Sequence, residues 1–178
     1  IYTGTIDARG AISQASTFDG GTATIDFGDD NVAQTYTVNG GVGPTLRFDA
    51  AADANDSLTF SAAGTLTGLF ITSAFSGTVP LVNAGDAALT ITSLNQSAGT
   101  LDLSAQSALN LSQLTLSGGT FLAPALITEV GSTGGAWDVN TTQTVRSVTL
   151  NTTSGAGSLS MAGADTVVVT GTLTLTNG

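Results

Sequence analysis

The sequence predicts an all-β fold, a parallel β-helix in which short strands stack on one another as a β-solenoid. Three observations predict it: a repeat of 20 positions within 89–123, apolar residues that alternate with small polar ones, and glycine-rich corners between the alternating segments. Side chains on a strand alternate between its two faces, so Leu-x-Leu places two aliphatic groups on one face. No stretch carries a helical period over three turns, which leaves strands as the only regular element.

The repeat is clearest at six matched positions. Adding 20 maps Leu89 onto Leu109, Ile91 onto Leu111, Leu94 onto Leu114, Gly99 onto Gly119, Thr100 onto Thr120 and Leu101 onto Phe121. The polar residues between them are expected to point outward, namely Thr90, Asn110, Thr115 and Asp102. Glycine reaches positive φ without steric cost, which suits the corners. One such unit buries too few aliphatic groups to fold alone, so units must stack on copies of themselves.

The other strands follow from the same alternation. Residues 22–27 and 35–38 alternate around a turn-forming stretch but show no clear repeat, so residues 1–40 are predicted to be an irregular β section or a cap over the open end. Further short strands are predicted at 45–48, 57–60, 65–71, 78–82, 125–127, 136–139, 148–150, 158–161 and 166–169. We therefore expect residues 1–178 to form a single solenoid domain of about eight or nine coils, clearest over 57–178. Because residues 172–178 read as an interrupted repeat, the chain is expected to be a piece of a longer one.

The composition excludes most partners and most enzyme chemistry. The chain has 13 acidic and 3 basic residues and a net charge of -10, which argues against binding to nucleic acid or to anionic lipid. No apolar run approaches the length of a membrane span, so membrane insertion by this segment is not expected. The three basic residues are Arg9, Arg47 and Arg146, so there is no Lys, and Cys and His are also absent. The usual general base, thiolate and Schiff-base lysine are therefore missing, and we expect neither an enzyme nor a cofactor.

Two acidic clusters are the candidate metal ligands, because Asp chemistry and oxygen-ligand metal binding remain open to this composition. The first cluster contains Asp26, Asp29 and Asp30 beside Asn31, and the second contains Asp49, Asp53 and Asp56 beside Asn55. Ca²⁺ takes about six to eight oxygen ligands, which carboxylates clustered on turns can supply. Neither cluster matches an EF-hand loop or the glycine-rich calcium nonapeptide, so the alternative is that both are solvated turns.

Other residues have a functional interpretation beside a structural one. Trp137 could stack on a sugar ring, or it could be a core or edge residue. Two of Asp102, Glu129 and Asp138 would suffice for glycosidase chemistry, although the arginines that acidic polysaccharides favour are far apart in sequence. The Thr-x-Thr pairs at 90/92 and 174/176 are similar to ice-binding rows. Variable coil lengths argue against a flat lattice, and outward Thr follows from β-propensity.

Several segments of the chain resemble a known class of surface protein. Residues 88–92, 98–103, 114–121 and 169–178 resemble the passenger regions of bacterial autotransporters, and they are also similar to filamentous-haemagglutinin-type adhesins. The richness in Gly, Ser, Thr and Asn and the lack of Cys are similar too. The resemblance covers residues 57–178 and not the first forty. It implies a right-handed parallel β-helix on, or released from, the outer surface of Gram-negative bacteria, and it brings no catalytic motif.

These observations together predict a non-enzymatic structural or adhesive β-solenoid at the cell surface or secreted, forming a stiff stalk or filament. Its expected partners are copies of the same chain, a receptor on a host or cell surface, or glycans. One alternative is a self-assembling surface-layer or pilus-like subunit whose assembly depends on Ca²⁺. Another is a carbohydrate-binding module that uses Trp137 and the Asp-rich turns.

Overall fold

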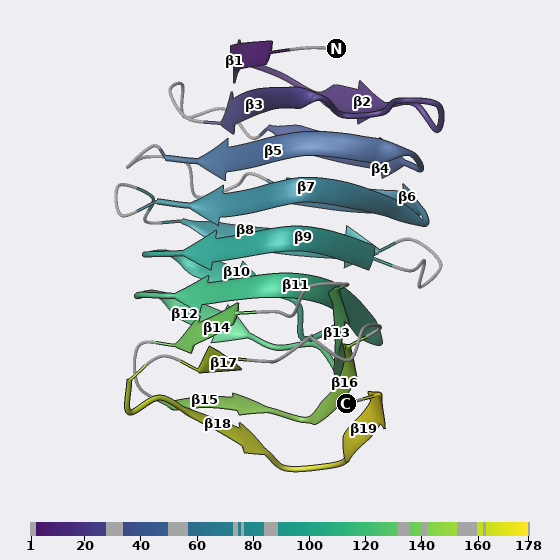
Figure 1. Ribbon diagram of the computed structural model, residues 1–178. Coiled ribbons are helices and arrows are strands. Elements are labelled where there is room, and N and C mark those ends of the chain that lie inside the picture. The colour runs from purple at the N-terminus through teal and green to yellow at the C-terminus, as the bar shows by residue number, and fades with distance from the viewer. Residues whose placement is uncertain are drawn as a thin grey trace.

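The computed structural model is a stack of parallel β-strands wound around one axis, which confirms the predicted β-solenoid (Figure 1). It describes residues 3–27, 34–49, 57–72, 75, 77–83, 89–131, 136–139, 142–152, 160–161 and 163–177. Strands are the only regular elements in these residues. The front strands in Figure 1 run to the left as the chain descends, so the coil is right-handed, as is usual for crossover connections between parallel strands.

The described residues form nineteen strands. In chain order they are β1 (Thr3–Ala8), β2 (Ile12–Gln14), β3 (Thr22–Phe27), β4 (Thr35–Asn39), β5 (Val42–Phe48), β6 (Ser57–Ala62), β7 (Gly64–Ile71), β8 (Thr78–Asn83), β9 (Leu89–Gln96), β10 (Thr100–Asp102), β11 (Ala108–Leu116), β12 (Thr120–Leu122), β13 (Leu126–Gly131), β14 (Ala136–Val139), β15 (Thr142–Val145), β16 (Ser147–Thr152), β17 (Ser160–Met161), β18 (Thr166–Val169) and β19 (Leu173–Asn177).

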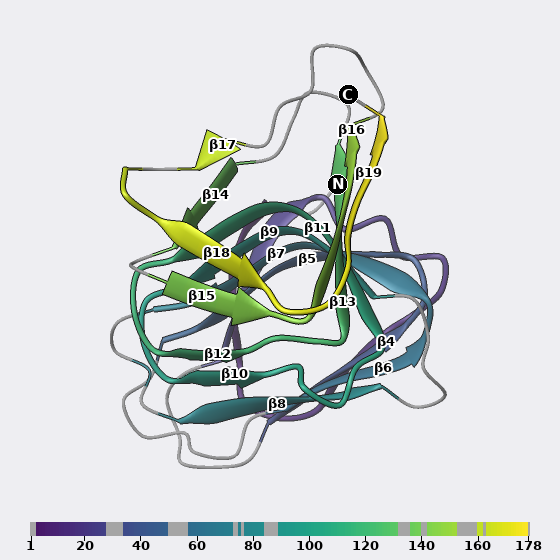
Figure 2. The same ribbon diagram turned by 90° about the horizontal axis from the view of Figure 1, so that it is seen from below.

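Each regular coil contributes one strand to each of two sheets. The first sheet runs β1-β3-β5-β7-β9-β11-β13-β16-β19, with β14 and β17 attached beside this path, and the second runs β2-β4-β6-β8-β10-β12. Figure 2, seen from below, shows the two sheets on opposite sides of the coil. The second sheet has six strands, so six coils have the two-sheet form. In the described residues, the coils that follow β12 add no strand to the second sheet, because β15 and β18 form a separate sheet.

The predicted repeat is confirmed by the pairing of β9 with β11 and of β10 with β12. The in-register partners are Leu89 with Leu109, Ile91 with Leu111, Leu94 with Leu114, Thr100 with Thr120 and Leu101 with Phe121. Gly99 and Gly119 have φ values of 61° and 79°, the left-handed conformation expected at the corners. A shift of one residue would turn every buried side chain outward, so the apolar alternation holds this register.

Coil length nevertheless varies along the stack. Ala108 pairs with Leu126 after 18 residues, whereas Gly64 pairs with Leu89 after 25. The extra residues lie in the connections between strands. The columns of inward side chains therefore stay continuous, although the number of residues per coil differs.

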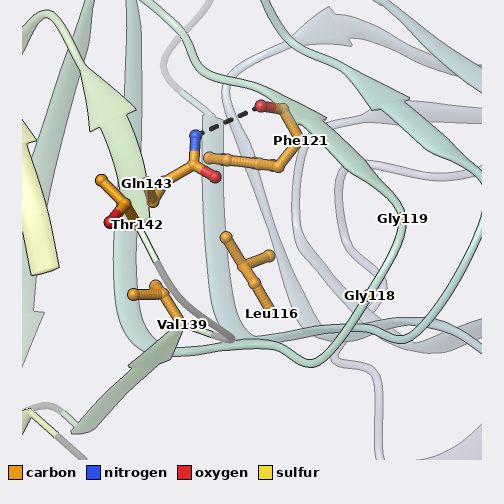
Figure 3. A pocket seen from close by; sticks show the side chains of 7 residues that line it. All are labelled: Leu116, Gly118, Gly119, Phe121, Val139, Thr142 and Gln143. Carbon is orange, nitrogen blue, oxygen red and sulfur yellow. Dashed lines mark hydrogen bonds between the residues drawn. The ribbon is translucent and has the colours of Figure 1, made fainter. Parts of the chain in front are cut away.

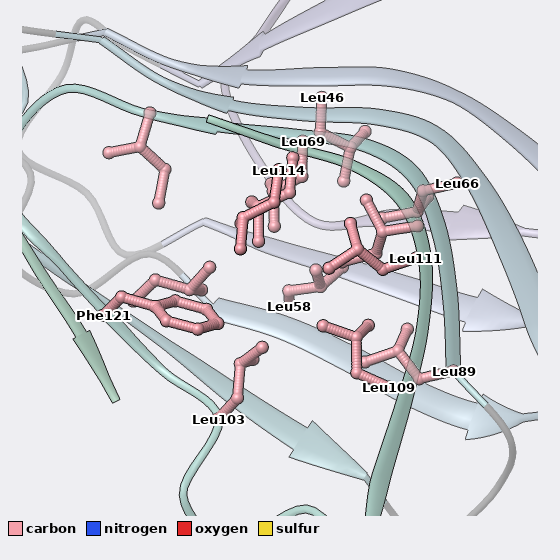
Figure 4. Packing of buried hydrophobic residues seen from close by; sticks show 14 of the residues in the cluster. Leu46, Leu58, Leu66, Leu69, Leu89, Leu103, Leu109, Leu111, Leu114 and Phe121 are labelled. Atoms are coloured by element: carbon pink, nitrogen blue, oxygen red, sulfur yellow. The ribbon is translucent and has the colours of Figure 1, made fainter. Parts of the chain in front are cut away.

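The core is a set of aliphatic columns that run along the axis (Figure 4). Leu46, Leu58, Leu66 and Leu69 have no exposed surface, and Leu89, Leu94 and Leu114 are each 1% exposed. Nearer the N-terminus the columns become aromatic, and the rings of Phe27 and Phe48 stack with centroids 4.8 Å apart. Burying such side chains stabilises the fold by about 1.5–3 kcal/mol each, which supplies most of the driving force for stacking.

The first forty residues contribute strands to the same stack. β1 pairs with β3 in parallel over six residues, from Thr3 with Thr22 to Ala8 with Phe27. β2 pairs with β4, from Ile12 with Tyr36 to Gln14 with Val38. The sequence predicts an irregular β section or a cap here, and the described residues place β1 and β2 at the outer edges of the two sheets.

The first sheet divides in the C-terminal part of the chain. β11 pairs with β13 through residues 108–111 and with β14 through residues 113–116. Beyond this point β13, β16 and β19 form one branch of the sheet, and β14 and β17 form another (Figure 2). The coils here therefore carry three strands, because β15 and β18 pair with each other as a separate sheet.

Candidate functional site

A small pocket lies where the sheet divides, next to the corner between β11 and β12 (Figure 3). Its volume is about 150 Å³, and it is lined by Leu116, Gly118, Gly119, Phe121, Val139, Thr142 and Gln143. The amide Nε2 of Gln143 donates hydrogen bonds to the carbonyl oxygens of Phe121 at 3.3 Å and of Thr144 at 3.1 Å. None of these lining residues is ionisable, and drug-sized ligands usually occupy sites of about 300–1,000 Å³, so the pocket suits a few waters.

In the described part of the chain, one residue of each acidic cluster forms an ion pair with the same arginine. Asp26 on β3 is the in-register partner of Arg47 on β5, and Nε and Nη2 of Arg47 both donate to the Asp26 carboxylate. Asp49 joins them, with its Oδ2 atom 3.3 Å from Nε of Arg47. The hydrogen bond to Asp26 raises the pKa of the Arg47 guanidinium above its ordinary value. A cation is therefore already in place between these two carboxylates.

The other predicted calcium ligands, Asp29, Asp30, Asp53 and Asp56, lie outside the described residues. Within the described ranges, no group of three or more acidic side chains comes close enough to hold a metal ion. Asp26 and Asp49 are thus brought together across neighbouring strands, with Arg47 between them.

Trp137 lies in the core. Its side chain is 2% exposed, and it is the in-register partner of Leu114 across β11 and β14. The indole Nε1 has no hydrogen-bond partner in the described structure. Trp137 therefore continues an aliphatic column of the first sheet, and a sugar could stack on it only if the ring left the core.

The three carboxylates considered for glycosidase chemistry do not share a cleft. Asp102 is on the second sheet, where it accepts hydrogen bonds from the Ser104 hydroxyl at 2.6 Å and backbone N–H at 3.0 Å. These hydrogen bonds lower the pKa of the Asp102 carboxyl. Asp138 is exposed on β14, whereas Glu129 on β13 is fully buried. The three side chains thus lie on different sheets or on opposite faces of one sheet.

Glu129 is the residue whose position the sequence analysis missed. It is the in-register partner of both Leu111 on β11 and Leu150 on β16. Neither carboxyl oxygen makes a hydrogen bond of standard geometry to any described residue. Burial raises the pKa of the Glu129 carboxyl, and the backbone N–H of Asn151 offsets part of that rise. The signal was available, because Ile127-Thr128-Glu129 has the same alternation as Leu109-Asn110-Leu111.

Comparisons with family models, curated proteins and solved structures found no match for this sequence. The described residues contain no helix long and apolar enough to span a membrane.

Proposed function

We propose that this chain is a non-enzymatic structural or adhesive β-solenoid, part of a stiff stalk or filament at a bacterial surface or in a secreted protein. The observation that carries the proposal is the unbroken series of parallel strand pairs along the first sheet from β1 to β19. A stack of this kind joins every coil to the next by a ladder of backbone hydrogen bonds and by buried aliphatic columns. Such a rod resists bending and proteolysis without disulfides.

The side of the rod supports an adhesive role better than a catalytic one. Its outward positions are mostly small polar residues, such as the in-register series Thr65, Thr90, Asn110, Thr128, Thr149 and Thr174 on the first sheet. Hydroxyl and amide groups present hydrogen-bonding partners without the charge that would select nucleic acid or anionic lipid. A protein receptor or a neutral glycan is the kind of partner that fits such a surface.

The experiment that tests the proposal measures shape and resistance together. Small-angle X-ray scattering with light scattering on the purified chain should give an elongated particle. The core of this particle should resist proteolysis equally with and without a reducing agent. The same measurements with Ca²⁺ and then with a chelator separate the alternatives. A rod unaffected by chelation supports the stalk, whereas growth that depends on Ca²⁺ supports the surface-layer subunit. A compact, protease-sensitive particle contradicts both.

Adhesion has its own readout. Binding of the fluorescently labelled chain to immobilised glycans and to cell surfaces should saturate for an adhesive segment. A chain that binds none of them, but remains a stiff rod, would be a spacer instead.

A further inference from the structure

Gln96, the last residue of β9, is a polar residue in an inward column of the first sheet, and it has no exposed surface. Its Nε2 atom donates hydrogen bonds to the carbonyl oxygens of Ala98 at 3.3 Å, Gly99 at 3.2 Å and Thr120 at 2.9 Å. Carbonyl oxygens accept hydrogen bonds and cannot donate them, so these atoms together form a receptor for an amide nitrogen. The corner between β9 and β10 is therefore closed by the carboxamide of its own glutamine.

The next coil repeats this corner without the glutamine. The residues that correspond to the Gln96 arrangement one coil later all line the small pocket beside that corner (Figure 3): Leu116, Gly118, Gly119 and Thr142. The leucine is the in-register partner of Gln96. The two glycines follow Ala98 and Gly99 by 20 positions, and the threonine begins β15 as Thr120 begins β12. Because an aliphatic side chain has no donor, the pocket lies where a glutamine amide would otherwise be.

The carbonyl groups of these corners point along the axis toward the following coil. A Cβ at Gly119 would lie 2.5 Å from the carbonyl oxygens of both Ala98 and Gly99, the corner residues of the preceding coil. Since the next corner repeats this backbone course, the carbonyl groups of Gly118 and Gly119 are expected to point into the pocket. By the same correspondence, the carbonyl group of Thr142 is expected to face the pocket from the opposite side.

The pocket has few donors of its own. In the described residues β12 is the last strand of the second sheet, because β15 pairs with β18 instead. Apart from Thr142 and Gln143, the lining residues have aliphatic or aromatic side chains or are glycines. The Gln143 amide donates to the carbonyl oxygen of Phe121 at 3.3 Å. Carbonyl groups without a partner are costly to bury, so a donor that enters the pocket gains hydrogen bonds.

We propose that this pocket binds a primary carboxamide, the CONH₂ group of a small molecule or of an asparagine or glutamine side chain on a partner protein. The Gln96 corner is the template, because there the chain holds such a group against corresponding acceptors. A volume of about 150 Å³ admits a few non-hydrogen atoms. Gly119 and Thr142 are exposed, so the pocket can be reached from solvent. The site goes beyond the structural role proposed above and does not depend on it.

The test follows the backbone amide signals of Gly118 and Gly119 by NMR while acetamide is added. These signals should shift and saturate, with a dissociation constant in the millimolar range or weaker, because so small a ligand makes few contacts. N,N-dimethylacetamide is the matched control probe. It keeps the carbonyl group and lacks both N–H donors, so it should leave the two signals unshifted.

Variants of the chain test whether the corner glutamine is the right template. Leu116→Gln should close the site from within the chain, so it should abolish the acetamide response and raise the melting temperature. Leu116→Met is similar in size and has no donor, so it should retain the response. Gln96→Leu should open a second site, where acetamide shifts the amide signals of Ala98 and Gly99. Circular dichroism establishes that every variant is folded.

Two supporting outcomes separate the sources of the carboxamide. Competition with acetamide by a blocked Gly-Gln-Gly peptide without a terminal primary amide would indicate a side chain of a partner protein. Binding of acetamide but not of the peptide would indicate a small molecule.

Four outcomes would overturn the proposal. Equal shifts with N,N-dimethylacetamide would show that the N–H donors are not recognised, and tighter binding of methylammonium would show that the site selects a cation. An acetamide response that persists in Leu116→Gln would place the binding elsewhere. No saturable shift of Gly118 or Gly119 at the highest soluble acetamide concentration would leave the pocket to water.

Discussion

Glu129 is the in-register partner of Leu111 across β11 and β13, so a carboxyl group occupies a position in an aliphatic column of the core. Neither β11 nor β16, the two strands paired with β13, contains an ionisable residue. The carboxyl is fully buried, and no arginine is among its strand partners. Burial favours the neutral form, because transferring a charge from water into an apolar core is costly.

The stability of the fold should therefore fall as pH rises through the folded-state pKa of Glu129. Burial raises this pKa, so the folded state holds its proton more tightly than the unfolded chain, whose glutamate pKa is about 4.3. The stabilisation is fully present below the unfolded value and is lost as pH increases. Thermal unfolding from pH 4 to pH 9 measures it, and the comparison is with Glu129→Gln, which lacks the titration. Parallel pH profiles for the two proteins would contradict the expectation.

Glu129→Leu should stabilise the protein at neutral pH. A buried polar group without good hydrogen-bond partners destabilises a fold by about 1–3 kcal/mol, and the substitution removes such a group. It also restores the aliphatic column of Leu111 and Leu150. Denaturant unfolding at pH 7 gives the free-energy difference. Leu150→Glu offers the opposite change at the next position of the same column and should destabilise the fold. A loss of stability in Glu129→Leu would indicate that the carboxyl has a stabilising partner.

Gly119→Ala should be far more destabilising than Gly163→Ala. Both glycines have positive φ, 79° and 52°. A Cβ at Gly119 would lie 2.5 Å from the carbonyl oxygens of Ala98 and Gly99, whereas nothing lies within 4 Å of one at Gly163. Gly163→Ala should therefore cost only the backbone strain of about 1–2 kcal/mol, and Gly119→Ala should cost more, because the corner must shift. Equal losses in urea unfolding would show that the corner relaxes freely.

Removing Arg47 should strengthen rather than weaken any calcium binding by the pair Asp26 and Asp49. The guanidinium now occupies the space between the two carboxylates, so Ca²⁺ must displace it. In Arg47→Leu both carboxylates lose this cation, and Ca²⁺ should raise the melting temperature more than in the unmodified chain. The double variant Asp26→Asn with Arg47→Leu should lose that gain. An equal calcium response in all three proteins would place any site away from this pair. Without Ca²⁺, Arg47→Leu should cost about 1 kcal/mol or less, because the guanidinium is partly exposed.

Trp137 should behave as a core residue in fluorescence and unfolding. It is the only tryptophan, so its emission reports one buried site. Emission should be blue-shifted in the folded protein and should not change on addition of oligosaccharides. Trp137→Ala should cost about 3–5 kcal/mol by leaving a cavity, whereas Trp137→Phe should cost less. A saturable change of emission with a glycan, abolished in Trp137→Phe, would instead support the carbohydrate-binding module.

The sequence alone determined the local pattern of this protein, because a strand segregates its side chains with a period of two. The pairs Leu89 with Leu109 and Leu101 with Phe121 could be read from the 20-residue repeat, as could the corners at Gly99 and Gly119. Each of these features depends on neighbours in sequence and on one fixed offset. The stacking of the units could also be predicted, because an isolated unit cannot bury its apolar face.

Only the tertiary structure decided which residues from coils of different length meet. Because the coils vary from 18 to 25 residues in length, no single repeat length in the sequence identifies which residues pair. The pairing of Asp26 with Arg47 and of Glu129 with Leu111 therefore appears only once the strands are in register. The same holds for Trp137, which a sequence cannot assign to the core or to the surface. Which side chains of a strand point inward is a local property of the chain. Which residue lies beside a given side chain on the next coil is not a local property, because it depends on the number of residues in the intervening corners.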